Sequence, residues 1–173
     1  MARDYYQCTI FPYPMGRLRG AWHQSATGRD ARSIPEPKVI LPIADEFIRR
    51  WREECSERNL YVETRCFGYP VRVYIEPAFR DIGYPLREDR RNGDKSNWNK
   101  ARRYRFLPCV RELLLNSEVP PIVNDRNNSL VLLGKANHRP RECFKVIIKE
   151  GEPEPGLYGY FLATFFPVDD WDK

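Results

Sequence analysis

The spacing of apolar residues predicts one clear amphipathic helix in the first half of the chain. From Ile43 to Cys55 apolar residues recur every three or four positions, and charged residues fill the opposite side. This pattern predicts a helix over about residues 43–58. The aliphatic run 39–41 just before it predicts a short strand that ends at Pro42, because proline lacks the N–H that a strand ladder uses.

Three further strands are predicted in the same half. Aromatic and β-branched residues at 5–11 predict a first strand, and the runs 60–67 and 71–76 predict two more, the last of them closed by Pro77. Residues 80–97 are rich in charges and turn formers, which predicts a loop or an internal boundary.

The second half predicts a helix followed by four strands. A helical segment starts near Trp98, is kinked or restarted at Pro108 and ends at Asn116. Four short apolar runs follow, at 122–123, 129–133, 144–149 and 158–166. We therefore expect an α+β fold in which a helix precedes a four-stranded antiparallel meander. Residues 1–96 would form an N-terminal helix-plus-strands extension or accessory region, and residues 97–173 the main unit with an acidic tail.

The last two strands are predicted to present two different faces. At 144–149 the lysines share one face, which includes Lys145, and the large apolar residues share the other. Uninterrupted alternation over 158–166 puts Tyr160 and Thr164 on one face. One side of the sheet can then pack on the helix while the other presents Lys, Tyr and Thr to a ligand. The alternative is that Tyr and Thr occur there because they are good strand residues.

Composition supports a packed domain with one strongly basic segment. Of the 173 residues, 42% are hydrophobic, and no apolar run reaches the length of about 18 residues that a membrane span needs. Since the N-terminus also lacks a signal-peptide core, we expect a cytoplasmic protein without membrane contact. The net charge of +5 divides into +3 over residues 1–96, +7 over 97–149 and −5 over 150–173. The basic block favours a polyanionic partner, and an unevenly charged solvated surface is the simpler alternative.

The cysteines and histidines indicate neither disulfides nor a metal centre. The five cysteines are an odd number, lie far apart and form no C-x-x-C pair. Neither His23 nor His138 has a cysteine within four residues, as a local zinc site would need. We expect reduced, mostly buried cysteines, no metal and no cofactor.

The densest group of chemically useful residues surrounds His138. Its neighbours in the sequence include four cations, namely Lys135, Arg139, Arg141 and Lys145. In metal-free RNA cleavage a base removes the 2′-hydroxyl proton, cations stabilise the phosphorane and an acid protonates the leaving oxygen. An imidazole among cations supplies those groups. The alternative is a surface loop that happens to contain one histidine.

The second half also resembles a nuclease superfamily. The resemblance covers about residues 97–167. It rests on the run from Lys100-Ala101-Arg102-Arg103 through Pro120, on His138-x-x-Arg141-x-x-Phe144-x-Val146-Ile147-Ile148 and on Leu162-Ala163-Thr164-Phe165-Phe166-Pro167. Their order and character resemble the barnase/EndoU/colicin/RelE-like superfamily, and in particular its small variants from phage and toxin contexts. The resemblance implies a helix followed by a four-stranded antiparallel sheet and RNA cleavage without a metal. It would assign Arg102 or Arg103, His138, Arg141, Lys145 and Thr164 to the site.

These observations favour one function and leave two alternatives. We expect RNA cleavage or RNA binding, with DNA as the second choice and a protein inhibitor or antitoxin as a further partner. The catalytic residues would be His138 for proton transfer, Arg141 and Lys145 for the phosphorane, and Thr164 for positioning. Further nucleic-acid contacts would come from Arg102, Arg103, Lys135, Arg139 and Tyr160. The alternatives are a non-catalytic nucleic-acid-binding module and a protein-interaction module that uses an exposed strand edge.

Overall fold

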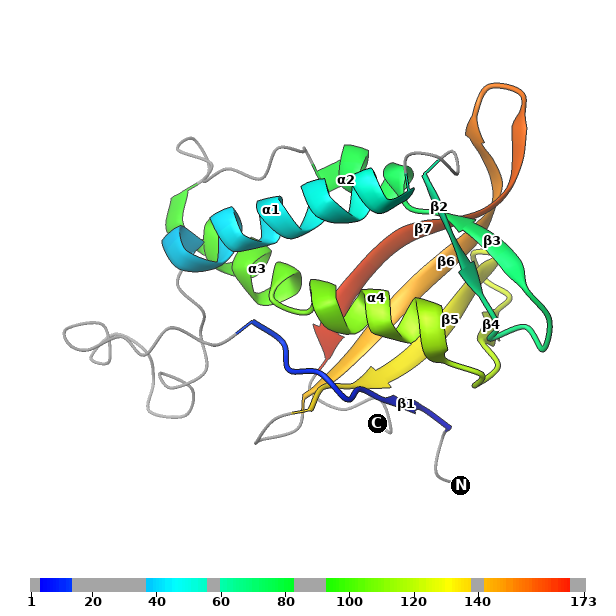
Figure 1. Cartoon of the computed structure of the whole chain (residues 1–173), viewed down its shortest axis with the longest axis horizontal. Coiled ribbons are helices and arrows are strands. Elements are labelled where there is room, and N and C mark those ends of the chain that lie inside the picture. The colour runs from blue at the N-terminus through cyan, green and yellow to red at the C-terminus, as the bar shows by residue number, and fades with distance from the viewer. Residues whose placement is uncertain (1–3, 14–36, 56–59, 83–92, 138–141, 169–173) are drawn as a thin grey trace.

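The computed structural model describes residues 4–13, 37–55, 60–82, 93–137 and 142–168, which form one layer of sheet and one layer of helices (Figure 1). The helices are α1 (Pro37–Cys55), α2 (Glu76–Ile82), α3 (Gly93–Tyr104) and α4 (Leu107–Asn116). The strands are β1 (Tyr6–Gln7), β2 (Tyr61–Thr64), β3 (Val71–Tyr74), β4 (Ile122–Asn124), β5 (Ser129–Lys135), β6 (Cys143–Glu154) and β7 (Leu157–Val168). In the part of the chain described, no helix is both long and apolar enough to cross a membrane.

The seven strands form a single mixed sheet. Its order is β1-β5-β6-β7-β3-β2, and β4 pairs with β5 off this path. The pairs β4–β5, β5–β6, β6–β7 and β2–β3 are antiparallel, whereas β1–β5 and β3–β7 are parallel. The predicted α+β class is confirmed. The predicted sheet of four antiparallel strands is too small, because strands from the first half of the chain join it in parallel.

Residues on both sides of position 96 share this sheet and one core. The strands β1, β2 and β3 come from residues 1–96 and lie in the same sheet as β4–β7. Trp51 of α1 packs edge-on against Phe79 of α2, with ring centroids 5.7 Å apart, and both belong to the core cluster that contains Phe144 of β6. An accessory role for residues 1–96 stays a prediction, but their packing is shared with the rest of the chain.

Helix α1 begins earlier than predicted. The predicted strand at 39–41 is wrong, because these residues belong to the helix. Ile40 and Leu41 are buried and extend the apolar stripe that continues through Ile48. Pro42 is the sixth residue of the helix, where it removes one backbone hydrogen bond and its ring crowds the preceding turn.

The region predicted as a loop contains parts of two helices. The predicted loop at 80–97 is wrong at both ends, since α2 runs to Ile82 and α3 starts at Gly93. Pro77 is the second residue of α2, where its missing N–H has no intrahelical partner to lose. Pro108 likewise stands at the start of α4 and marks a fresh helix rather than a kink.

The helix-covered face of the sheet is closely packed. Phe144, Val146 and Ile148 of β6 are fully buried there, as the alternation predicted. Phe144 stacks on Phe106 at a centroid distance of 5.6 Å. Its ring also fills the space above Gly134 of β5, because a Cβ at Gly134 would lie 2.3 Å from the ring. The five cysteines are all buried and free, so the predicted burial is confirmed for each of them.

A β-bulge interrupts β7. The pairing with β6 shifts so that Ile147 lies opposite Thr164, whereas Ile148 lies opposite Leu162. The extra residue in β7 is Ala163, and it breaks the alternation of side chains between the two faces. The predicted uninterrupted alternation over 158–166 is therefore wrong.

The bulge separates Tyr160 from Thr164. Leu162 is fully buried on the helix side, and Tyr160, two residues before it, lies on that side as well. The ring of Tyr160 contacts Phe67 at a centroid distance of 5.0 Å. Tyr160 and Thr164 were predicted to share a face, and the structure places them on opposite faces.

Candidate nucleic-acid interface

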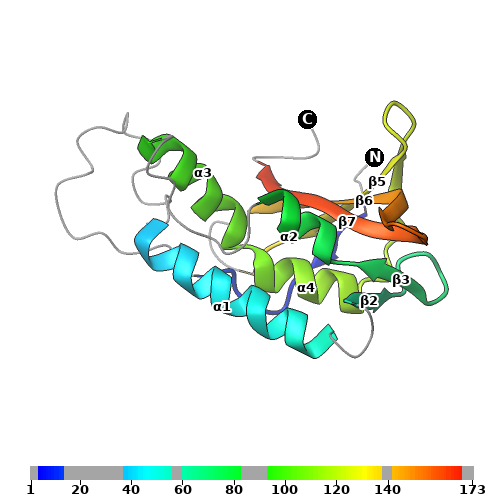
Figure 2. The same ribbon diagram turned by 90° about the horizontal axis from the view of Figure 1, so that it is seen from above.

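The face of the sheet that none of the described helices covers is the candidate site, and we call it the open face. Figure 2 shows α1 and α4 along one side of the sheet, and no described helix runs along the other. The residues that the register assigns to the open face include Tyr61, Glu63, Arg72, Tyr74, Val131, Leu133, Lys135, Lys145, Ile147, Lys149, Phe161, Thr164 and Phe166. Apart from Leu133, all of these side chains are half-buried or exposed.

Lysines and aromatic rings lie opposite each other across β6 and β7. Lys145 is paired with Phe166, and Lys149 is paired with Phe161. The strand rise of about 3.3 Å per residue puts the two lysines roughly 13 Å apart along β6. Thr164 lies between the two pairs and is a diagonal neighbour of Lys145 on the same face. The open face therefore offers two cations, two rings and a hydroxyl side by side.

More aromatic and cationic side chains extend the open face across β3 and β2. Tyr74 is the parallel partner of Phe161, and its ring packs edge-on against Tyr61 at 6.0 Å. The guanidinium of Arg72 lies 4.7 Å from the centre of the Tyr61 ring. Glu63 is paired with Arg72 across the two strands, and it is the one acidic residue that β2 and β3 contain. The aromatic character thus continues over strands that are distant in the sequence, and the single cation there, Arg72, lies opposite Glu63.

The other end of the open face holds Lys135. Its ammonium lies 4.3 Å from the centre of the Tyr5 ring, which a parallel pairing of β1 with β5 brings beside it. A small cluster formed by Leu133 and Cys143, with Val168 packed against them, supports this end of the face. The predicted nucleic-acid residue Lys135 is therefore on the same face as Lys145.

A hollow of about 420 Å³ lies where β4 meets β5. It is lined by Ile122, Val123, Asn124, Asp125, Arg126, Val131, Leu133 and Lys145. The apolar residues of β4 and β5 suit a flat ring, and Lys145 and Arg126, opposed by the single carboxylate of Asp125, leave a net positive charge that suits an anion. Sequence reasoning missed this hollow, although its lining includes the run 122–123 that was predicted as a strand.

The other predicted site residues lie elsewhere. Arg102 and Arg103 are on α3, in the helix layer, so they are not on the open face with Lys145 and Thr164. Tyr160 lies on the helix side, as described above. The predicted residues His138, Arg139 and Arg141 lie outside the described residues.

Arg105, which follows Arg102 and Arg103 in the sequence, is buried and forms an ion pair within the protein. Its side chain is 3% exposed and forms an ion pair of 2.5 Å with Glu142, just before β6. Its Nε also donates to the backbone carbonyl of Tyr13. Burial lowers the pKa of Arg105, while the Glu142 carboxylate opposes that shift. This pair ties the helix layer to the start of β6, and its charge is not offered to a ligand.

A buried carboxylate fixes the N-terminal segment in a similar way. Glu112 of α4 accepts hydrogen bonds from the backbone N–H of Thr9, at 2.9 and 3.0 Å, from its hydroxyl, and from the N–H of Ile10 at 3.3 Å. Asn137 donates to the carbonyl of Thr9 from the other side. Through these hydrogen bonds Glu112 anchors the backbone of Thr9 and Ile10 to α4.

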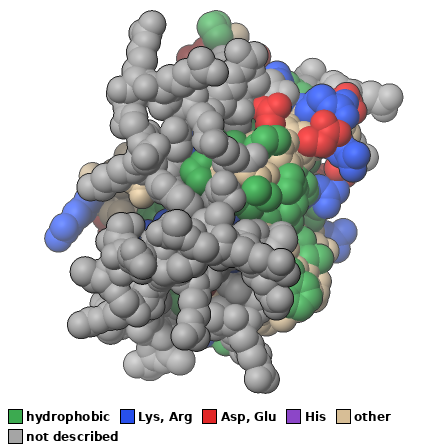
Figure 3. All heavy atoms as spheres, turned by 90° about the vertical axis from the view of Figure 1, so that its left-hand side faces the viewer, with side chains coloured by type: hydrophobic (Ala, Val, Ile, Leu, Met, Phe, Trp, Pro, Cys, Tyr) green, Lys and Arg blue, Asp and Glu red, His purple; other side chains and the backbone are tan. Residues whose placement is uncertain are grey.

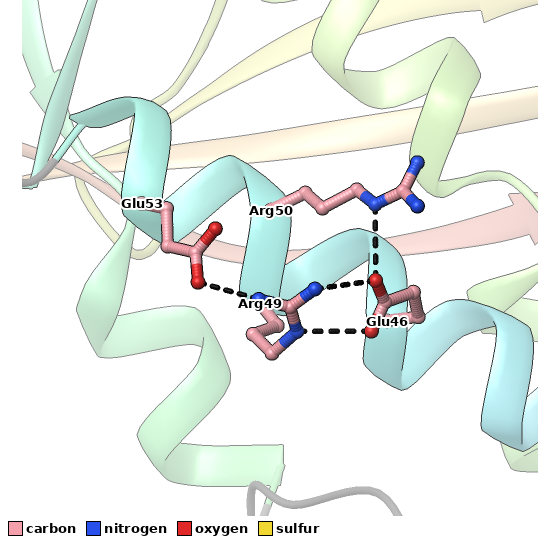
Figure 4. Close-up of polar contacts among 4 residues, drawn as sticks. All are labelled: Glu46, Arg49, Arg50 and Glu53. Carbon is pink, nitrogen blue, oxygen red and sulfur yellow. Dashed lines mark hydrogen bonds and ion pairs between the residues drawn. The ribbon is translucent and has the colours of Figure 1, made fainter.

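The charges on α1 are largely neutralised within the helix. Arg49 bridges Glu46 and Glu53, each at 2.5 Å, and Arg50 bonds Glu46 at 3.0 Å (Figure 4). Hydrogen bonds from Arg49 and Arg50 lower the pKa of Glu46 to about 2. Figure 3 shows acidic and basic side chains intermixed at this corner of the molecule, beside a group of hydrophobic ones. The mixture contrasts with the lysine-rich open face.

Among the described residues, no three His, Cys, Asp or Glu side chains are grouped as a metal site would require. Comparisons with models of protein families, with curated proteins and with solved structures find no match for this chain.

Proposed function

We propose that the open face binds single-stranded RNA. The observation that carries this proposal is the alternation of cations and aromatic rings across β6 and β7, where Lys145 lies opposite Phe166 and Lys149 opposite Phe161. Proteins that bind single strands combine a positively charged track for phosphates with rings on which bases stack. A sheet face free of helices gives an extended strand access to both.

The aromatic side chains favour a single strand over a duplex. Bases in a duplex are stacked on each other, so Phe161, Phe166 and Tyr74 can stack only on bases that are unpaired. The hollow beside Lys145 offers a place for one base that leaves the strand, with its phosphate near the ammonium. Arg102 and Arg103 would contact RNA only where the strand extends past the sheet to the helix layer.

Metal-independent cleavage is the second candidate, and a specific juxtaposition favours it. Lys145 and Thr164 are diagonal neighbours on the open face, and β6 begins just after the segment that contains His138 and Arg141. In this proposal His138 transfers the proton, Arg141 and Lys145 stabilise the phosphorane, and Thr164 positions the substrate.

The likeness to the barnase/EndoU/colicin/RelE-like superfamily also stays a proposal. Its support is the order of elements, because α4 is followed by β4, β5, β6 and β7, which pair in sequence order and antiparallel. A protein inhibitor or antitoxin that covers the open face, and a cytoplasmic location in which the free cysteines stay reduced, belong to the same proposal.

The test is titration of the purified chain with fluorescent single-stranded RNA in the presence of a chelator. We expect salt-dependent binding that Lys145→Gln weakens and Arg50→Gln, a matched loss of one charge on α1, does not. Products with 2′,3′-cyclic ends that disappear in His138→Ala would establish cleavage, and binding without products would establish the non-catalytic module. If RNA and DNA both fail to associate at low salt, the proposal is wrong and the protein-interaction module replaces it.

A further inference from the structure

The tip of the β6–β7 hairpin has a chemistry unlike that of the open face. Figure 1 shows this hairpin extending beyond the rest of the sheet, away from the helices. We call its helix-side surface the acidic tip, formed by Glu150, Tyr158 and Tyr160 of the hairpin with Phe67 and Tyr69 of the neighbouring β2–β3 turn.

Only negative charges are present along this part of the hairpin. Residues 150–168 include Glu150, Glu152 and Glu154 and contain no Lys or Arg. Glu150 is exposed and is paired with Tyr160 across the strands, so its carboxylate stands beside the tyrosine rings. Glu152 is engaged by the backbone N–H of Gly156 in the turn, which leaves Glu150 as the acid next to the rings.

The rings of the acidic tip are close together and two of them are open to solvent. Tyr158 is 71% exposed and Tyr69 is 61% exposed, whereas the ring of Tyr160 packs at a tilt against Phe67, with centroids 5.0 Å apart. Tyr158 and Tyr160 stand on the same side of β7, two residues apart. The Glu150 carboxylate raises the pKa of Tyr158, and burial followed by Glu150, Tyr69 and Tyr158 raises that of Tyr160, so these groups interact.

We propose that the acidic tip binds the side chain of a Lys or Arg presented by a basic peptide segment of a partner protein. The faces of Tyr158 and Tyr160 attract a cation through their quadrupoles, and the Glu150 carboxylate adds a charge-assisted hydrogen bond. Phosphates are repelled by the same carboxylates, so this surface is distinct from the RNA-binding face and does not depend on that proposal. The sheet then carries a cationic surface on its open face and a cation-binding surface on the helix side of the β6–β7 hairpin.

The test is a nuclear magnetic resonance titration of the full chain, without RNA and at low salt, with a hexa-arginine peptide. We expect shifts of the Tyr158 and Tyr160 ring signals, and none with a peptide that has glutamine in place of each arginine. Glu150→Gln and Tyr158→Leu should each weaken binding about threefold to fivefold, whereas Tyr158→Phe, which keeps the ring, should bind as the native chain does.

The matched control is Glu118→Gln, an exposed glutamate after α4 that lies outside the acidic tip. Because Tyr158 is mostly exposed, its variants are expected to fold, and their backbone spectra report whether they do. If the ring signals do not move, or if Glu118→Gln weakens binding as much as Glu150→Gln does, the acidic tip is not a cation site.

Discussion

Neighbouring residues of β6 stand in opposite environments. Phe144, Val146 and Ile148 are fully buried under the helices, whereas Lys145 and Lys149 on the open face keep part of their surface in water. The same strands therefore serve two purposes. Close packing makes the helix-covered face sensitive to any change of volume, and the open face can vary in chemistry without unfolding the sheet.

The largest expected effect is on the helix-covered face. Phe144→Ala removes a ring that stacks on Phe106, so we expect the free energy of unfolding to fall by about 3–5 kcal/mol. Phe166→Ala on the open face should lower it by roughly 1 kcal/mol, because that ring is only partly buried. Urea unfolding measures both values. Similar losses for the two variants would mean that the open face is covered in solution.

Two glycines, one on each face of the sheet, allow the packing of the two faces to be compared by adding a methyl group to each. Gly134→Ala should destabilise by about 1–3 kcal/mol, since its Cβ would lie 2.3 Å from the Phe144 ring. Gly159→Ala on the open face meets Tyr74 at 3.4 Å, an ordinary contact, and should change the stability by about 0.5 kcal/mol or less. A neutral Gly134→Ala would contradict the packing of β5 against Phe144.

The affinity for RNA should depend on the open face and not on the helix-covered face. If a base stacks on Phe166, Phe166→Ala should weaken RNA binding about tenfold, within the range of 1–3 kcal/mol per stacked base, while the fold is retained. Phe67→Leu, which changes a ring on the helix side, is the control and should leave the RNA affinity unchanged. Fluorescence anisotropy measures both, and equal losses would assign the RNA to another surface.

The smallest expected effect is a loss of stability at alkaline pH. Burial, aided by Glu112, raises the pKa of Tyr6 to about 12 from an ordinary value of 10.0. Between these values the unfolded chain loses the phenol proton and the folded chain keeps it, so stability is full below pH 10 and falls as the pH rises toward 12. Tyr6→Phe should flatten this fall in urea midpoints. An unaltered slope in Tyr6→Phe would contradict this assignment.

The contrast between the faces also explains what could be predicted from the sequence. The two faces of β6 were predictable because the alternation around Lys145 is local and unbroken. On β7 the same reasoning failed at Ala163, since nothing in the local pattern marks a bulge. Pro42 misled in the same way, because a proline near a helix start and one that ends a strand look alike in sequence.

Long-range pairing accounts for most of what the sequence did not reveal about the site. Tyr74 and Phe161 are 87 positions apart and become neighbours only through the parallel pairing of β3 with β7. Tyr5 reaches Lys135 through the parallel pairing of β1 with β5. Such contacts leave no periodic signal in either segment, so the predicted site contained the cations of the second half and lacked the aromatic rings of the first.

The most direct test of the open face as the RNA-binding surface is the salt dependence of binding to single-stranded RNA. Two double variants remove the same charge, Lys145→Gln with Lys149→Gln on the open face and Arg49→Gln with Arg50→Gln on α1. Log affinity falls with log salt, and each phosphate contact contributes about 0.7 to the steepness of that fall. The open-face double variant should therefore make the fall shallower by about 1.4. The α1 pair should leave the slope unchanged, because its arginines are already bound to glutamates. Equal slopes in the two double variants would contradict the assignment of RNA binding to the open face.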